Sequence, residues 1–150
     1  MLKLFIETAN IFLCQRRKIN MTKTTNYEIS KKLSKAGFGK GSAFAYFKSK
    51  CGGGDIFYVF EGIKGGYEAE FFSYDLETIL DALPKEIEFR GKEYCFWMQW
   101  SGSSDCYIMG YVHGNLRATE LEVWREDDEN KSLADIAGEM WLILKKKGLI

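Results

Sequence analysis

The most regular hydrophobic pattern of the chain lies close to its C-terminal end. Between residues 132 and 147, six apolar side chains recur at offsets of 0, 3, 4, 7, 8 and 11 residues, the spacing of one stripe on an α-helix. Ser132 and Asp135 are spaced to cap the first turn, and Gly148 is placed to end the helix in a left-handed conformation. The sequence therefore predicts a terminal helix with one buried face. The stripe consists of Leu133, Ile136, Ala137, Met140, Trp141 and Leu144.

Two shorter helical patterns precede this one. Thr25, followed by Glu28, fits a capping box in which the threonine is the N-cap, and it predicts a helix over residues 26–36. Asp75 is the expected cap of a second short helix over residues 76–83, which carries its own leucine and isoleucine stripe.

The hydrophobic period changes to two between the helices, which predicts strands. The nearly continuous apolar run 55–61 is typical of a central strand, and Gly65-Gly66 predicts a hairpin turn from it into the next strand. No βαβ pattern occurs. We therefore expect an α+β fold, with a single antiparallel sheet of about 6–7 strands and two or three helices packed on one face. The expected strands are 43–48, 55–61, 67–74, 86–90, 93–100, 106–113 and 116–126.

Residues 1–20 differ from the rest of the chain. Their apolar run is interrupted by polar residues, so it is too short for a membrane span, and a basic cluster follows it where a signal peptide has one before. We expect residues 1–20 to be an N-terminal extension outside the fold, and residues 21–150 to form a single α+β domain.

The net charge is zero but unevenly distributed. Residues 1–50 contain eleven Lys and Arg against two acids, residues 51–100 four against ten, and residues 101–150 six against nine. Because a dedicated nucleic-acid binder relies on a basic excess to neutralise phosphates, the overall balance argues against direct nucleic-acid binding.

Four cysteines show no CxxC spacing, and we expect no secretory leader before them. This pattern predicts free thiols in a reducing, cytoplasmic environment. The cysteines are Cys14, Cys51, Cys95 and Cys106.

No pattern typical of catalysis or metal binding occurs in the chain. His113, the only histidine, shares no ligand spacing with Cys95 or Cys106. Cys106 and His113 are seven residues apart on one expected strand, which places them on opposite faces and argues against a nucleophile pair. We predict no catalytic, cofactor-binding or metal-ligating residue, and hence a non-enzymatic protein.

Two glycine-rich loops support an alternative. The loop 37–42 resembles a phosphate-binding loop but lacks a Ser or Thr directly after its lysine. Together with the loop 51–54, it would frame a ligand pocket lined by Lys40, Cys51 and Asp55. A small ligand-binding protein or enzyme is therefore the competing hypothesis.

Three expected strands repeat the pattern Glu-x-Glu. On one sheet, the face opposite the helices would carry these carboxylates together with a tryptophan. A solvent-exposed sheet face is the ordinary interpretation. The functional interpretation is a surface that binds a protein partner with a basic surface. The candidate partner-binding residues are Glu68, Glu70, Glu86, Glu88, Glu120, Glu122 and Trp124.

The aromatic content suggests a second surface. Phe, Trp and Tyr together exceed what a core of this size must bury, so we expect some of them, such as Trp100, Tyr107 or Tyr111, to be exposed. Exposed aromatic residues would mark a homodimer or a partner patch.

Several segments resemble those of small uncharacterised α+β proteins of phages, prophages and mobile elements. They are LETILDALP (76–84), the Y-x-F-x-M strand (94–98), a Gly-Tyr strand (110–111) and the helix SLADIAGEMWLILKKKGLI (132–150). These motifs are structural, so the resemblance implies no catalytic residue. It implies an accessory role such as counter-defence, and an inhibitor of a host defence nuclease is its concrete form. A dimeric structural phage component is a further alternative.

Overall fold

The computed structural model describes residues 24–49, 56–60, 67–101, 106–114, 116–117, 124–125 and 131–150. The expected extension over residues 1–20 lies outside them. The helices are α2 (Tyr27–Lys35), α3 (Leu76–Ala82) and α4 (Leu133–Lys146). The strands are β1 (Phe44–Ser49), β2 (Ile56–Phe60), β3 (Tyr67–Ser73), β4 (Glu86–Phe89), β5 (Lys92–Ser101), β6 (Cys106–His113), β7 (Leu116–Arg117) and β8 (Trp124–Arg125).

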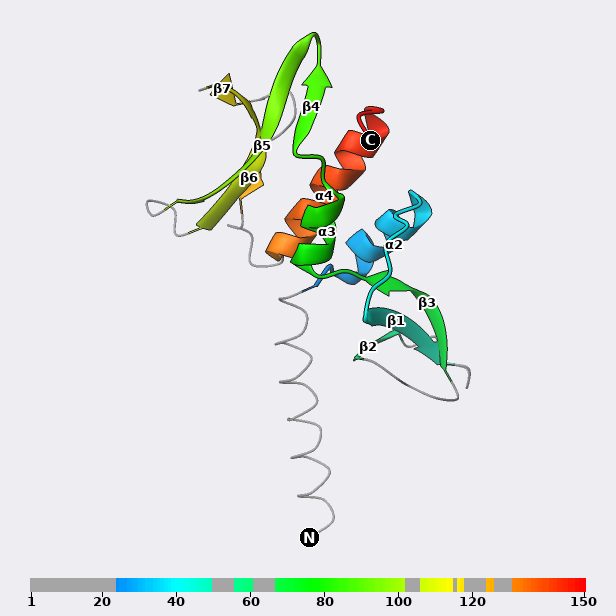
Figure 1. Cartoon of the computed structure of the whole chain (residues 1–150). Coiled ribbons are helices and arrows are strands. Elements are labelled where there is room, and N and C mark those ends of the chain that lie inside the picture. The colour runs from blue at the N-terminus through cyan, green and yellow to red at the C-terminus, as the bar shows by residue number, and fades with distance from the viewer. Residues whose placement is uncertain are drawn as a thin grey trace.

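The strands form two antiparallel sheets. One has the order β2-β1-β3, and the other has the order β4-β5-β6-β7, with β8 pairing β6. The three helices of the described residues lie between the two sheets (Figure 1). The α+β class and the antiparallel pairing are confirmed, but the prediction of one sheet of 6–7 strands with helices on one face is wrong. The helix α3 separates the two sheets in the chain, because β3 ends immediately before it and β4 begins immediately after it.

The small sheet also corrects the expected strand order. A hairpin across Gly65-Gly66 would pair β2 with β3, but both strands pair with β1 on its opposite edges. β1 is therefore the central strand, and β2 lies at an edge of the described sheet. Ala45 and Tyr46, which are adjacent on β1 and so point to opposite faces, are both buried, as expected of a central strand.

The helix ends are well defined by their caps. Ser132 and Asp135 form the predicted capping box of α4, and Asp75 caps α3 as predicted. The N-cap of α2 is Asn26, whose side-chain oxygen accepts from the Ile29 N–H at 3.0 Å, so the prediction of Thr25 as the cap is wrong. The hydroxyl of Thr25 is occupied elsewhere, as described below.

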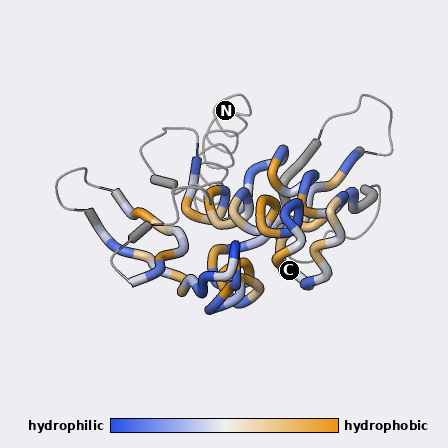
Figure 2. Tube along the Cα trace, turned by 90° about the horizontal axis from the view of Figure 1, so that it is seen from above, coloured by the Kyte–Doolittle hydropathy of each residue, from blue (hydrophilic) through white to orange (hydrophobic). Residues whose placement is uncertain are grey.

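The apolar core surrounds α4. Hydrophobic positions alternate with hydrophilic ones along the coiled helices (Figure 2). The α4 stripe meets α2, α3 and the inner face of the large sheet, where Tyr94, Met109 and Tyr111 are buried. Gly138 allows the close approach of α2: a Cβ built there would lie 2.8 Å from Ile29 Cγ2. The buried part of α4 comprises Ala134, Asp135, Ile136, Ala137, Gly138, Met140, Trp141 and Leu144.

The hairpin of β4 and β5 turns at Arg90 and Gly91, so Arg90, expected as the last residue of the strand 86–90, belongs to the turn. Both residues have positive φ angles, 53° and 72°, which is the conformation that a two-residue hairpin turn requires. Ile87 points inward and is 5 % exposed, so the alternate residues of β4 point away from the helices.

Candidate functional site

The residues predicted to form one acidic face do not share a sheet. Glu86 and Glu88 lie on β4, whereas Glu70 lies on β3 in the other sheet. The prediction of one acidic face assumed that all the strands belong to one sheet. It is wrong because the strands form two sheets. Outside the described residues lie the side chains of Glu68 and Trp124 and the whole of Glu120 and Glu122.

Glu70 occupies an irregular position in β3. The ladder with β1 shifts register there, so that Phe71 and Ala69 have successive partners while Glu70 has none. Its exposed carboxylate accepts a hydrogen bond from the Tyr27 hydroxyl at 3.4 Å. Glu70 therefore contacts the start of α2 and lies in a different sheet from the acids of β4.

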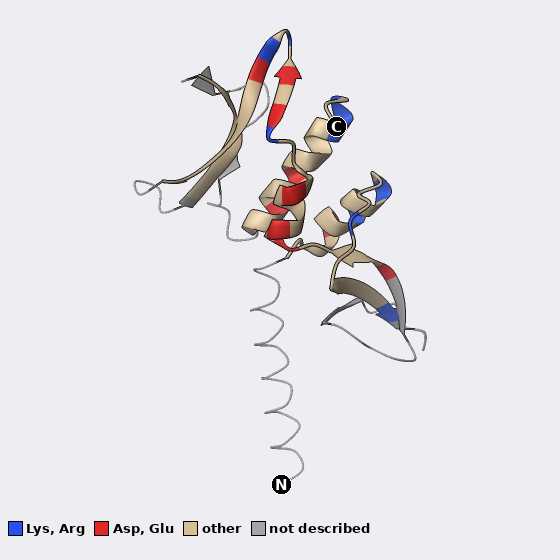
Figure 3. Cartoon of the chain, in the orientation of Figure 1, with Lys and Arg blue, Asp and Glu red and all other residues tan. Residues whose placement is uncertain are grey.

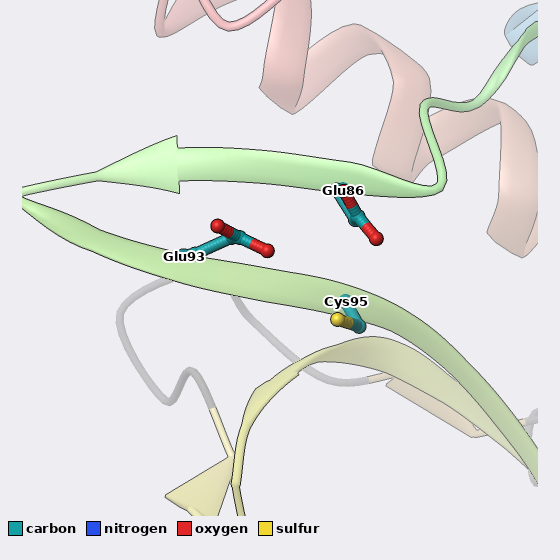
Figure 4. A group of neighbouring side chains, drawn as sticks. All are labelled: Glu86, Glu93 and Cys95. Atoms are coloured by element: carbon teal, nitrogen blue, oxygen red, sulfur yellow. The ribbon is translucent and has the colours of Figure 1, made fainter.

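The outer face of the β4–β5 hairpin gathers four polar side chains. The register places Glu86 opposite Cys95 and Glu88 opposite Glu93, and all four are exposed. The acidic positions of the two strands lie side by side (Figure 3). Glu86, Glu93 and Cys95 point into the same space (Figure 4), and their possible ligand atoms lie within 4.8 Å of one another.

The electrostatics of this hairpin face are unfavourable for the isolated chain. Glu88 and Glu93 are direct cross-strand neighbours, and like charges in that position destabilise an antiparallel pair. In the described part of the chain, neither carboxylate has an ion pair, and neither does Glu86. We name Glu86, Glu88 and Glu93 the hairpin carboxylates.

The arrangement of Glu86, Glu93 and Cys95 also contains ligand types that Zn²⁺ accepts, namely two carboxylates and a thiol. A structural zinc site needs a fourth ligand and hydrogen bonds that orient the ligands. His113 does not supply one, because its ring turns to the opposite face and packs 5.7 Å from the Tyr94 ring. All three candidate ligands are exposed to solvent. The hairpin face therefore resembles an ordinary solvent-exposed surface more than an enclosed metal site.

Sequence reasoning identified Glu86 and Glu88 but missed their neighbours Glu93 and Cys95. The residues of the β4–β5 turn contain the information that would have identified Glu93 and Cys95. Once Arg90 and Gly91 are taken as the two turn residues, the strands pair in a fixed register, and Glu93 must face Glu88.

The loop 37–42 has a structural role in the fold. Gly37 ends α2 with a φ of 78°, and the Phe38 N–H closes the helix on the Leu33 carbonyl at 3.0 Å. The Phe38 ring is buried between the rings of Tyr74 and Trp141, at centroid distances of 4.6 and 4.9 Å. Of the residues proposed to line a ligand pocket, Lys40 is exposed, and Cys51 and Asp55 lie outside the described residues.

The exposed aromatic residues are partly those predicted. Trp100 is 47 % exposed and Tyr107 37 % exposed, and their rings meet edge to face at a centroid distance of 4.9 Å. Tyr111 was expected with them but is 1 % exposed, because its hydroxyl donates to the Pro84 carbonyl under the large sheet. Burial raises the pKa of the Tyr111 hydroxyl.

A buried polar cluster at the N-terminal ends of α2 and α4 was not predicted. The Thr25 carbonyl accepts from the hydroxyls of Ser30, Tyr46 and Ser73, at 3.2, 3.1 and 2.7 Å. The Thr25 hydroxyl accepts from the Tyr74 N–H at 3.0 Å. This hydroxyl node joins α2 to both β1 and the end of β3, which explains why Thr25 is not available as a helix cap.

Asp135 extends this cluster to α4. Its carboxylate, 1 % exposed, accepts from the backbone N–H groups of Asn26 at 2.6 Å and of Ser132 at 2.9 Å. Burial raises the pKa of the Asp135 carboxyl, and these hydrogen bonds oppose that rise in part. One carboxylate thus accepts hydrogen bonds from backbone N–H groups at the N-terminal ends of both α2 and α4.

Comparison with known proteins returned no relative: no family model, no curated protein and no solved structure matches the chain. Among the helices of the described residues, none has the length and apolar character that crossing a bilayer requires.

Proposed function

We propose that this protein is a non-enzymatic interaction module that binds a partner with a basic surface through the hairpin carboxylates. The observation that carries the proposal is the direct opposition of Glu88 and Glu93 beside Glu86, with no ion pair to any of them among the described residues. A chain that keeps uncompensated like charges on one face bears a cost in the free state. A cationic partner removes that cost on binding.

The shape of the carboxylate group supports a partner that normally binds nucleic acid. Three carboxylates on two neighbouring strands present a compact anionic patch to a groove lined with Lys and Arg. The resemblance to phage and mobile-element proteins makes a host defence nuclease the concrete candidate, with this chain as its inhibitor.

The test is affinity capture with matched variants of the full chain. The Glu86→Gln, Glu88→Gln, Glu93→Gln triple variant removes all three charges and is expected to lose the captured partner. The control variant Glu28→Gln, Glu77→Gln, Asp81→Asn removes the same number of exposed carboxylates from α2 and α3. It is expected to retain the partner, because those carboxylates lie on other surfaces.

Two further measurements make the test specific. Capture should weaken steeply as salt rises, since the attraction is electrostatic, and duplex DNA should displace the chain from its partner. If the triple variant captures the same protein as the wild type, the hairpin carboxylates are not the binding surface. If DNA does not compete, the partner does not bind through a nucleic-acid groove.

The ligand-pocket alternative has less support, because the loop 37–42 uses its phenylalanine to close the core. The dimeric alternative is favoured by a separate feature, the edge of β5 that β4 does not cover.

A further inference from the structure

The strand β5 has an open edge over its second half. β4 accompanies β5 only as far as Cys95, and one additional hydrogen bond, from the Phe96 N–H to the Lys85 carbonyl at 2.7 Å, closes that ladder. β6 continues along the other edge to Ser101. Within the described residues, no strand covers the β4 side of β5 beyond Phe96.

The backbone at this edge is oriented for pairing. Because the Phe96 N–H points to the β4 side, alternation along an antiparallel strand directs the N–H and C=O groups of Met98 and Trp100 to the same side. The described residues give these groups no partner. An exposed edge of this kind is a template for another strand.

The side chains at the open edge are apolar and uncharged. Residues 94–101 contain no Lys, Arg, Asp or Glu, although charged residues are the usual protection of a free edge. Met98 is 40 % exposed and Trp100 47 % exposed, and both share a face with Tyr107. The edge therefore suits a neutral, apolar strand, and a strongly charged one would lose solvation without gaining an ion pair.

The β5 edge itself meets this description, so we propose that two copies of this chain pair through β5 to form a two-fold symmetric dimer. With the axis at Gln99, Met98 of each copy faces Trp100 of the other. Both pairs are hydrogen-bonded, giving four backbone bonds across the axis. The thioether of Met98 lies against the indole of the second copy, which is a favourable contact. The two exposed patches thereby become one contiguous buried patch.

The axis position gives a direct covalent test. The two Gln99 residues form a non-hydrogen-bonded cross-strand pair, with Cα atoms about 4.5 Å apart. That separation is within the range of about 4.4–6.8 Å that a disulfide accepts. In a background in which Cys14, Cys51, Cys95 and Cys106 are all changed to Ser, oxidised Gln99→Cys is expected to yield a disulfide-linked dimer whose mapped peptide joins position 99 to position 99. Glu88→Cys in the same background, exposed on the outer face of β4, is the control and is expected to stay monomeric on a denaturing gel.

The non-covalent test uses sedimentation velocity of the full chain over a concentration series. The wild type is expected to dimerise. Trp100→Pro removes the outward N–H, Trp100→Lys places a charge at the edge, and both are expected to be monomeric with unchanged circular dichroism. The matched control is Phe72→Lys, at an aromatic residue that is 45 % exposed on β3 of the other sheet, and it should dimerise like the wild type.

Three results would overturn the proposal: a monomeric wild type at every concentration, a dimer that persists in both Trp100 variants, or a dimer that Phe72→Lys also dissociates. The dimer is independent of the proposed partner binding. The triple variant of the hairpin carboxylates should therefore remain dimeric, and the two ideas can fail separately.

Discussion

At the scale of single residues, the molecule depends on a few polar groups whose role is set by burial. The spacing of Ser132 and Asp135 predicts a capping box, and the structure confirms it. The second bond of Asp135, to the Asn26 N–H, joins residues 109 positions apart in the chain. No local pattern contains that information, which is why a routine helix cap could be predicted and a link between two helices could not.

Asp135 makes stability depend on pH. Its pKa is raised in the folded state by burial, so the folded protein binds this proton more tightly than the unfolded chain does. The contribution of this group to the free energy of unfolding is therefore greatest below its ordinary pKa of about 4 and falls as pH rises through the raised value. Urea unfolding of the wild type and of Asp135→Asn across this range should show a difference that changes with pH. A constant difference would contradict the prediction.

Gly138 sets how closely α2 and α4 approach. Alanine is the better helix former by about 1 kcal/mol, but its Cβ would lie 2.8 Å from Ile29 Cγ2 and 3.3 Å from Leu33 Cδ1. Gly138→Ala should therefore give none of the usual stabilisation, and Gly138→Val should lower the free energy of unfolding by roughly 1–3 kcal/mol. Thermal melts of both variants test this. A raised melting temperature for Gly138→Ala would show that the two helices can separate without cost.

At the scale of elements, hydrophobic period and turn residues predict most of the fold. The stripe of α4 and the cap of α3 lie where the sequence places them, and the bounds of β4 and β5 are within one residue of those expected. The sequence also predicts one buried face for α4, whereas Ala134 and Gly138 are buried as well, and Gly138 packs against α2. Small residues carry little hydrophobic signal, so a close helix contact that depends on them is not visible in the pattern.

The buried stripe of α4 predicts a large effect of charge at its centre. Met140 is 2 % exposed, so Met140→Asp should cost roughly 3–5 kcal/mol through the lost packing and an unpaired buried carboxylate. Lys146→Asp, at the exposed last turn, also introduces an aspartate on α4 and should cost less than about 1 kcal/mol. Chemical denaturation monitored by tryptophan fluorescence compares the two. Similar midpoints for both variants would place Met140 outside the core.

At the scale of the whole molecule, the division of the strands into two sheets was not predictable from the pattern. Strand periodicity shows that a segment is extended and which residues alternate, but it does not select the partner strand. β2 and β3 show this: they are adjacent in the chain, yet each pairs with β1. The same lack of information about strand partners affects the candidate site. The acids of β4 were predicted to share one face with those of two other strands, whereas the fold groups them with Glu93 of β5.

The two sheets are attached to the helices by different means. The large sheet contributes Tyr94, Met109 and Tyr111 to the apolar core around α4. Of β1 and β3, the residues whose side chains the structure describes contribute none to that core. The small sheet is held by the hydroxyl node of Thr25 and by the ring contacts of Tyr27 with Tyr46.

This difference implies two cooperative units that open at different free energies. Polar and edge contacts stabilise less than burial in a continuous apolar core, so the small sheet should undergo local opening while α4 and the large sheet stay folded. Native-state hydrogen exchange should then show β1 amides exchanging at a lower opening free energy than the amides shared by β5 and β6. Equal protection in both sheets would mean a single unit of unfolding. With two units, a bound partner on the β4–β5 hairpin would slow exchange in one half of the molecule and leave the other half unchanged.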